Sequence, residues 1–203
     1  MPSKNQDLHG NTPDKSETVL LLIDVINDLE FAEGELLLEH ALPMARRLLT
    51  FKRRAKAAGV PAIYVNDNFG RWQSDFTRQV EHCLHDGVRG QPIVELLHPD
   101  EDDYFVLKPK HSGFYSTNLD ILLRYLGVKR VVITGIATNI CVLFTANDAY
   151  MRDFELLVPA DCVAANEEAD NRYALEQMRT VLKADIRNSP EIEFSERKGG
   201  QQS

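Results

Sequence analysis

The chain alternates short apolar runs with longer segments in which apolar side chains recur every three or four positions. Residues 18–23 form an almost continuous aliphatic run, which is typical of a strand buried on both faces of a sheet. Similar short runs occur at 61–65, 105–107, 130–134 and 154–158. These segments predict the strands of a buried, mainly parallel sheet.

Helical periodicity fills the spaces between these runs. The spacing predicts helices over 41–58, 118–126, 138–151 and 169–182. Gly59 and Gly127 directly follow the first two helices, where a helix end favours glycine. Strand–helix alternation with short connections predicts an α/β fold with three layers, α/β/α, around a central, mainly parallel sheet of Rossmann-like topology.

The polar ends of the chain set the expected domain boundaries. Residues 1–17 and 195–203 lack an apolar pattern, whereas nothing between them resembles a flexible linker. Segments without apolar side chains to bury do not form a packed core. We therefore expect a flexible N-terminal tail over 1–17, one domain over 18–194 and a flexible C-terminal tail over 195–203.

Composition narrows the class of partner. The 203 residues include 31 acidic and 23 basic side chains, and the net charge of −8 gives no general attraction to nucleic acid or an anionic membrane. No apolar run approaches the roughly 20 residues of a membrane helix, and the N-terminal segment lacks the apolar centre of a signal peptide. The three cysteines show neither a paired framework nor metal-ligand spacing, which favours a reducing compartment. We expect a cytoplasmic protein that acts on a small-molecule substrate, with no nucleic-acid and no membrane partner.

Three reactive side chains follow three of the predicted strands. Asp24 comes after the first strand, Lys108 follows 105–107, and Cys141 ends the turn that follows 130–134. In parallel sheets the ligand binds beyond the carboxyl ends of the strands. An acid, an amine and a thiol are therefore expected to meet at one edge of the sheet.

Each of these residues also has a simpler interpretation. Asp24 suits a turn or a helix cap as well as a general base, and most lysines are solvated surface charges. A free cysteine is usually a small core residue, but a helix N-terminus lowers the pKa of a thiol and offers N–H donors to an oxyanion. Cys83 and Cys162 lack such a setting, and we interpret both as structural.

Several motifs together resemble the isochorismatase-like cysteine hydrolases. They are Leu-Leu-Ile-Asp-Val-Ile-Asn-Asp at 21–28, Val-Leu-Lys-Pro-Lys-His-Ser-Gly-Phe at 106–114 and Gly-Ile-Ala-Thr-Asn-Ile-Cys-Val at 135–142, and the similarity extends over about 18–186. The resemblance implies the same mainly parallel sheet flanked by helices and assembly into a homo-oligomer, a dimer or a tetramer. No cofactor is expected.

The resemblance also implies roles for individual residues. By their positions in the motifs, Asp24, Lys108 and Cys141 form the catalytic triad. The family commonly has a cis peptide just before the threonine of its Gly-x-x-Thr motif, which places one between Ala137 and Thr138. Backbone N–H groups of Thr138 and Cys141 would then form an oxyanion hole.

Two departures from the family pattern concern polar groups. Nicotinamidase-type members bind a metal through an Asp-x-His motif after the second strand, where this chain has Asp67, Asn68 and Phe69. Since Phe69 cannot ligate a metal, no metal site is expected. Ile26 replaces a glutamine that usually follows the triad aspartate, which removes one polar group near the site.

The triad favours a hydrolase that cleaves a C–N bond of a small amide or carbamoyl compound through a Cys141 thioester. Vinyl ether hydrolysis of isochorismate, which does not need the thiol, is an alternative, as is a non-catalytic binding protein on the same fold. The expected lining of the substrate pocket is Phe31, Asp67, Phe69, Trp72, Phe114, Tyr115 and Phe144.

Overall fold

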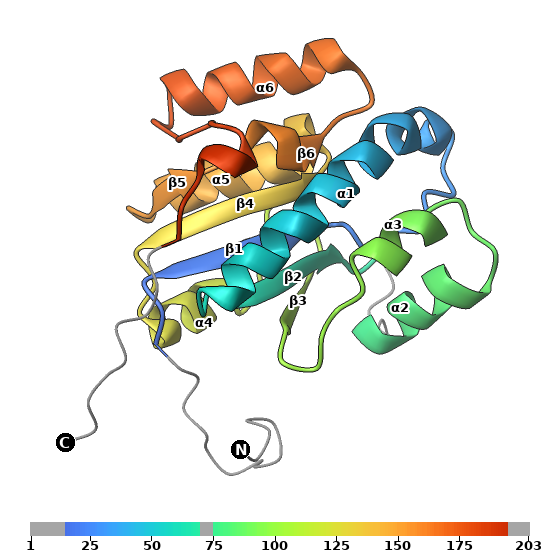
Figure 1. Ribbon diagram of the computed structural model, residues 1–203, viewed down its shortest axis with the longest axis horizontal. Helices are drawn as coiled ribbons and strands as arrows, with labels where there is room; N and C mark the ends of the chain where they lie inside the picture. Colours follow the sequence, from blue (N-terminus) through green and yellow to red (C-terminus); the bar gives the residue numbers. More distant parts are fainter. Residues whose placement is uncertain (1–14, 70–74, 195–203) are drawn as a thin grey trace.

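The computed structural model describes residues 15–69 and 75–194 and shows a parallel β-sheet with helices on both faces (Figure 1). All strand pairs among these residues are parallel, and the strand order is β3-β2-β1-β4-β5, with β6 beside the end of β4. The strands are β1 (Thr18–Ile23), β2 (Ala62–Asp67), β3 (Tyr104–Lys108), β4 (Arg130–Ile136), β5 (Glu155–Leu157) and β6 (Val163–Ala164). The predicted α/β fold around a parallel sheet is confirmed.

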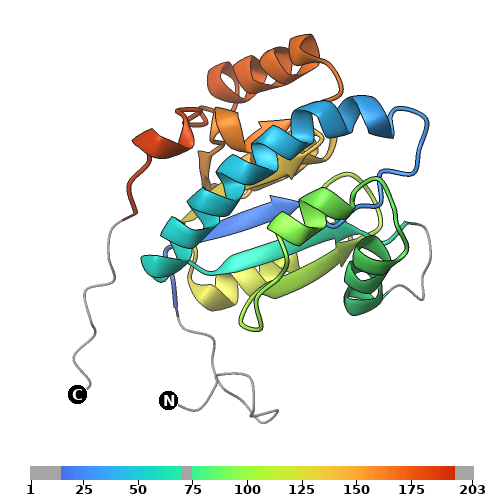
Figure 2. The ribbon, with the colours of Figure 1, turned by 45° about the vertical axis from the view of Figure 1, so that its right-hand side comes forward.

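Helices form the two outer layers. One apolar cluster contains side chains of α1, α2 and α3, and a second one contains side chains of α4, α5 and α6, on the opposite face of the sheet (Figures 1 and 2). The helices are α1 (Gly34–Ala57), α2 (Phe76–His85), α3 (Gln91–Leu96), α4 (Leu119–Leu126), α5 (Leu143–Tyr150) and α6 (Glu168–Thr180), with a π-helical turn (Thr138–Val142) before α5 and 3-10 turns at Ala160–Cys162 and Ser189–Glu191.

The central strand β1 shows why the sheet needs two helical layers. Successive side chains of a strand point to opposite faces, so Leu20 and Leu22 pack under α1 while Leu21 and Ile23 pack under α4 and α5. All four side chains are completely buried. A strand that is apolar on both faces is stable only between two covering layers, and this explains the continuous aliphatic run in the sequence.

The structure adds elements that the hydrophobic pattern does not predict. α1 begins at Gly34, before the predicted start at residue 41, and α2, α3 and β6 were not predicted. α2 is mostly polar and buries only Phe76, Val80 and Cys83. Elements as short as α3 and β6 contain too few residues for a periodicity to register.

The ordered fold begins shortly before β1. The Ser16 amide donates to the Leu126 carbonyl, and the Glu17 carbonyl accepts from two backbone amides at the start of β4, so the end of the predicted N-terminal tail is hydrogen-bonded. The remainder of that tail and the C-terminal one, 195–203, lie outside the described residues. None of the helices in the described ranges combines the length and the apolar character that a membrane crossing requires.

Candidate active site

Asp24 is the first residue beyond β1, at the carboxyl edge of the sheet. Its amide donates to the Val65 carbonyl of the neighbouring strand at 3.0 Å, and its Oδ1 accepts the Asp67 amide at 2.7 Å. The backbone of Asp24 has φ = 51°, a left-handed conformation that aspartate tolerates better than most residues. The turn therefore directs a buried carboxylate back over the end of β2.

Lys108 is the last residue of β3 and lies opposite Asp67 in the register of β2 and β3. Its Nζ is 2.8 Å from Asp24 Oδ2, 3.5 Å from Cys141 Sγ and 3.5 Å from Asp67 Oδ2. The side chain is completely buried. The structure thus brings Asp24, Lys108 and Cys141 together, and it adds Asp67, predicted as a pocket residue, as a second carboxylate beside the ammonium group.

Cys141 lies in the π-helical turn that connects β4 to α5. The amides of Ile140 and Val142 both donate to the Ala137 carbonyl, and the intervening Cys141 amide is not part of that pairing. The Cys141 carbonyl accepts the hydroxyl of Thr145 at 2.7 Å, which fixes the turn to the first residues of α5. The wide turn presents the thiol toward Lys108.

The predicted position of the cis peptide is wrong by one residue. The cis bond joins Ile136 and Ala137, not Ala137 and Thr138. β4 still pairs with β6 at Ile136, opposite Ala164, so the chain leaves the sheet directly after Ile136. Thr138 already belongs to the π-helical turn, where it is completely buried and its hydroxyl donates to Asn171 Oδ1 at 2.5 Å.

Burial controls the protonation of the three groups. It raises the pKa of Asp24, although the Lys108 ammonium and a hydrogen bond from Cys141 act against it. Burial, followed by the charge of Asp24, raises the pKa of the Cys141 thiol, and Lys108 offsets this only in part. For Lys108, burial lowers the pKa, but the carboxylates and the thiol outweigh it and the net shift is upward. The lowered thiol pKa expected from a helix N-terminus is therefore not found, because desolvation and the neighbouring carboxylate raise the pKa of Cys141.

The other two cysteines are core residues, as predicted. Cys83 and Cys162 are buried in the apolar cluster on the α1 face of the sheet. Burial raises the pKa of each thiol to about 12. Burial therefore favours the neutral thiol at both positions, although the charge of Arg47 acts against it at Cys162.

The structure places the aromatic residues predicted for the pocket in different surroundings. Phe144 is exposed one helical turn beyond Cys141, and Phe69 is exposed next to Asp67, whose carboxylate accepts its amide. Phe31 and Tyr115 are exposed as well, but no hydrogen bond or ring contact in the described part of the chain joins them to the three central residues. Trp72 lies outside the described residues.

Phe114 is not a pocket residue. It is buried in the core under α4 and α5, where its ring stacks on Phe154 with centroids 6.2 Å apart and lies under the Arg152 guanidinium at 4.7 Å. Ser112 and Gly113 are buried together with Phe114, and their hydrogen bonds hold this part of the backbone against α5. Phe114 therefore packs in the core and does not line the pocket.

Two residues near the thiol were not identified from the sequence. His111 Nδ1 is 4.0 Å from Cys141 Sγ, and the buried Thr145 hydroxyl links the Gly113 amide to the Cys141 carbonyl. Thr145 follows Cys141 by one helical turn, so the spacing in the sequence already indicates that the two residues lie on the same face of the helix. His111 lies three residues after Lys108, on a loop whose path no periodicity predicts.

Acidic residues also gather at Asp100, Asp102 and Asp103. Lys56 Nζ contacts all three carboxylates at 2.6–2.9 Å, and Lys52 Nζ lies 2.5 Å from Asp103 Oδ2. The two ammonium groups occupy the positions that a cation would need. The cluster is an ion-pair network that ties α1 to the segment before β3.

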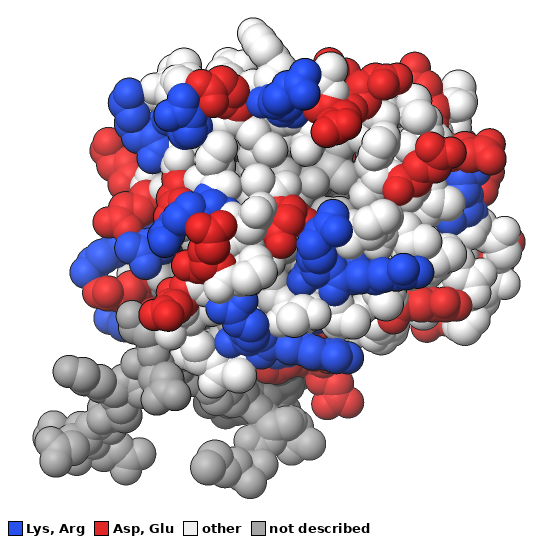
Figure 3. All heavy atoms as spheres, turned by 45° about the horizontal axis from the view of Figure 1, so that its top comes forward, with Lys and Arg blue, Asp and Glu red and all other residues white. Residues whose placement is uncertain are grey.

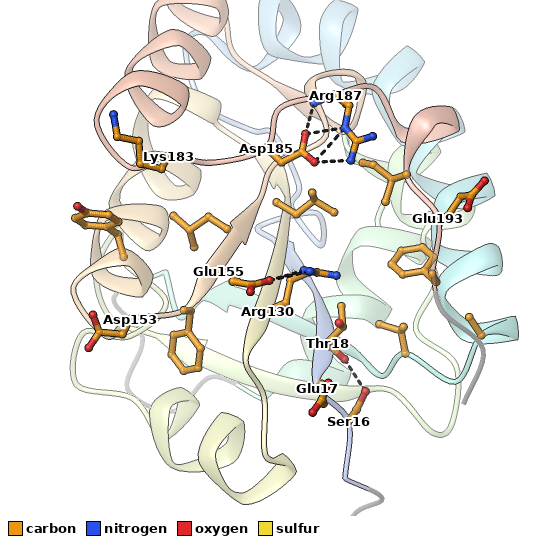
Figure 4. Close-up of a pocket in the computed structure, with 18 of the residues that line it drawn as sticks. Ser16, Glu17, Thr18, Arg130, Asp153, Glu155, Lys183, Asp185, Arg187 and Glu193 are labelled. Carbon is orange, nitrogen blue, oxygen red and sulfur yellow. Dashed lines mark hydrogen bonds and ion pairs between the residues drawn. The ribbon is translucent and has the colours of Figure 1, made fainter. Parts of the chain in front are cut away.

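A hollow of about 1140 Å³ lies at the opposite edge of the sheet (Figure 4). Its wall includes Thr18, Arg130 and Glu155, the first residues of β1, β4 and β5. Two ion pairs lie in its wall, Arg130 with Glu155 and Arg187 with Asp185. Basic and acidic side chains are similarly interspersed over the face shown in Figure 3. None of the three cysteines is among its lining residues, so its size does not make it the expected site of thiol chemistry.

The chain is similar to several known proteins. The family model described as the isochorismatase domain matches residues 18–186. YaaI of Bacillus subtilis (strain 168), described as an uncharacterized isochorismatase family protein, is 43% identical over 178 residues, which cover 88% of this chain and 97% of that protein. The ureidoacrylate amidohydrolase RutB of Methylorubrum extorquens (strain AM1) is 29% identical over 198 residues, with coverage of 83% and 79%.

A solved structure extends the likeness to three dimensions. The crystal structure of N-carbamoylsarcosine amidase from Thermoplasma acidophilum has a TM-score of 0.68 and 30% sequence identity, and the alignment covers 88% of this chain and 99% of that one. The range of the family match includes the segments that carry Asp24, Lys108 and Cys141. This chain belongs to the isochorismatase family and is a hydrolase.

Proposed function

We propose that this hydrolase cleaves a C–N bond of a small amide or carbamoyl compound, with Asp24, Lys108 and Cys141 as its catalytic triad. The proposal depends mainly on the Lys108 ammonium, which is buried between the Asp24 carboxylate at 2.8 Å and the Cys141 sulfur at 3.5 Å. Two similar proteins are named for reactions at such bonds, ureidoacrylate amidohydrolase and N-carbamoylsarcosine amidase.

Acylation begins with proton transfer from Cys141 to Asp24. Because its pKa is raised by burial, Asp24 is a stronger base than an exposed carboxylate. The raised pKa of Cys141 keeps the thiol protonated at rest, so the proton leaves as sulfur attacks the substrate carbonyl carbon. Lys108 stabilises the negative charge as it moves from the carboxylate to the sulfur.

Backbone amides then stabilise the tetrahedral intermediate. We place the oxyanion at the N–H groups of Thr138 and Cys141, since the neighbouring amides of Ile140 and Val142 donate to the Ala137 carbonyl. One such donor contributes about 3 kcal/mol to lowering the barrier. Asp24 returns the proton to the leaving nitrogen, the C–N bond breaks, and water hydrolyses the thioester.

The test is to quench turnover with acid and to locate the acyl group by peptide mass mapping. Wild-type protein with N-carbamoylsarcosine, or with another member of a panel of amides and ureides that it turns over, should carry the acyl group on Cys141. Cys141→Ala should bind the same substrate, remain folded and form no adduct. An adduct on Cys83 or Cys162 with Cys141 unmodified contradicts the proposal. Full activity of Cys141→Ala toward isochorismate would instead indicate vinyl ether hydrolysis.

A further inference from the structure

His111 lies on the solvent side of the Cys141 thiol. Its Nδ1 is 4.0 Å from Sγ, while Lys108 approaches the same sulfur from the buried side. The imidazole also packs against Phe144, with ring centroids 5.4 Å apart and planes tilted by 56°. Cys141 and Phe144 are three residues apart in the same helical segment, so both present side chains to the exposed imidazole.

Buried and partly buried hydrogen bonds hold the His111 loop against the segment that carries Cys141. The Ser112 hydroxyl donates to Asp148, and the Gly113 amide donates to Thr145 Oγ1 at 3.0 Å. The Thr145 hydroxyl in turn donates to the Cys141 carbonyl at 2.7 Å. The two residues after His111 are therefore tied to α5, and the imidazole is positioned by the same helix that positions the thiol.

The two basic groups beside the thiol differ in their accessibility and in their partners. Asp24 is buried, its Oδ1 accepts the Asp67 amide, and its Oδ2 faces Lys108. His111 is exposed, and in the described part of the chain the contacts of its ring are those with Cys141 and Phe144. Once an acyl group is attached to the sulfur, water from solvent reaches the thioester from the His111 side.

We propose that His111 is the general base of deacylation, a step that exists only if the proposed thioester mechanism is correct. Imidazole accepts protons near neutral pH, and a base must lie within hydrogen-bond reach of the attacking water. Nδ1 takes one proton as the water oxygen bonds to the acyl carbon. The C–S bond then breaks, the thiolate of Cys141 takes that proton from the imidazolium, and the acid is released. The two half-reactions thus use different bases, Asp24 on the buried side and His111 on the solvent side.

The test uses p-nitrophenyl acetate, which acylates a reactive thiol and releases a coloured phenolate. Wild-type protein should show an initial burst as Cys141 is acetylated, followed by a steady state limited by deacylation. His111→Asn keeps a polar atom near the position of Nδ1 but is not a base. It should retain the burst and lose about 100-fold in the steady-state rate, the lower range of a general-base contribution.

Two further readouts separate a catalytic role from a structural one. Acetyl-Cys141 should accumulate in His111→Asn by mass mapping, and hydroxylamine, a nucleophile that needs no base, should restore most of the release rate. His85→Asn, at an exposed histidine of α2 paired with Glu81, is the matched control and should behave as wild type.

The outcomes distinguish this inference from the proposed function. If wild-type Cys141 is acetylated and deacylation in His111→Asn is unchanged, or if burst and steady state fall together without accumulation, His111 is not the deacylation base and the triad proposal stands. If wild-type Cys141 is never acetylated, the thioester mechanism itself is wrong, and the role of His111 with it.

Discussion

Two ion pairs with the same separation occupy opposite edges of the sheet. Lys108 and Asp24 at the carboxyl edge, and Arg130 and Glu155 at the amino edge, each have a nitrogen–oxygen distance of 2.8 Å. The side chains of the first pair are 0% and 7% exposed, and those of the second are 49% and 66% exposed. The two ion pairs therefore have the same separation and differ in their exposure to solvent.

Solvent decides what each pair does. At the amino edge water screens both charges, so the pair contributes little to stability and leaves both groups with ordinary chemistry. At the carboxyl edge both side chains are removed from water, so each charge is stabilised mainly by its partner. The same desolvation raises the pKa of Asp24, which makes its carboxylate a stronger base. The hollow at the amino edge therefore does not by itself make that edge the candidate for catalysis.

Burial of an ion pair is not sufficient to make a catalytic site. Lys52 and Asp103 form another buried pair, but their remaining hydrogen-bonding positions are taken by Tyr64 and Lys56. The Lys108 ammonium instead faces a sulfur atom that has an exposed side. A buried charge beside a nucleophile distinguishes the carboxyl edge from both of the other places.

The largest expected effect is on turnover and uses the same substitution at both edges. Asp24→Asn should reduce kcat by at least about a thousandfold, because it removes the base of acylation. Glu155→Gln should leave kcat within a factor of two or so of wild type, since it changes an exposed pair. Steady-state assays on any amide that the wild type hydrolyses provide the measurement. Equal losses in both variants would remove the functional distinction between the two edges.

The second effect is on stability. Lys108→Met leaves the Asp24 carboxylate buried without its ammonium partner and should lower the free energy of unfolding by about 3–5 kcal/mol. Arg130→Met, the same loss of charge at the exposed pair, should cost under about 1 kcal/mol. Urea denaturation at pH 7 measures both values. If Arg130→Met is the more damaging variant, burial is not what separates the pairs.

A third effect concerns the reactivity of the thiol without substrate. The charge of Asp24 helps to raise the pKa of Cys141, so Asp24→Asn should lower that pKa and leave Lys108 to stabilise a thiolate. At pH 7 the variant should therefore react with iodoacetamide several-fold faster than wild type, although its turnover is lost. The rate is followed by mass mapping of the Cys141 peptide. Slower alkylation in the variant would indicate that Asp24 activates the thiol even at rest.

The smallest effect is at the exposed edge and depends on pH. Arg187 lowers the pKa of Asp185, so this pair contributes stability above the ordinary carboxyl pKa and loses it as the pH falls through the lowered value. Asp185→Asn should cost under about 1 kcal/mol at pH 7 and less in 0.5 M salt. The difference from wild type should shrink as the pH falls below the ordinary carboxyl pKa, and it should vanish once the carboxylate is protonated. A difference that persists there would mean that the side chain acts through packing and not through charge.

The fold was predictable where the hydrophobic pattern is compatible with only one kind of element. The run at 18–23 coincides with β1, because a strand that is apolar on both faces fits only the middle of a covered sheet. No bounds were predicted for α2, most of whose residues are polar, and the start of α1 was placed too late at residue 41. The periodicity of apolar residues in the sequence reflects which side chains are buried. Helices and strands that bury little surface therefore show only a weak periodicity.

The candidate site was predictable in part for a topological reason. Parallel strands place their carboxyl ends at one edge, so Asp24, Lys108 and Cys141 had to be neighbours if the strands were correct. Their order along the sheet and their separations were not predictable. Phe114 and the cis bond show the limit, because the sequence pattern does not reveal whether a ring points into the pocket or into the core, or which peptide bond of a turn is cis.

The sequence alone determined the layered fold and the three reactive groups at one edge, since both follow from which residues are apolar and where each strand ends. The tertiary structure decided the environment of those groups. It raised the pKa of Cys141 where a helix N-terminus suggested a lower one, and it brought His111 to the exposed side of the sulfur. Desolvation and through-space charge depend on neighbours that are distant in sequence, and these exist only after the chain has folded.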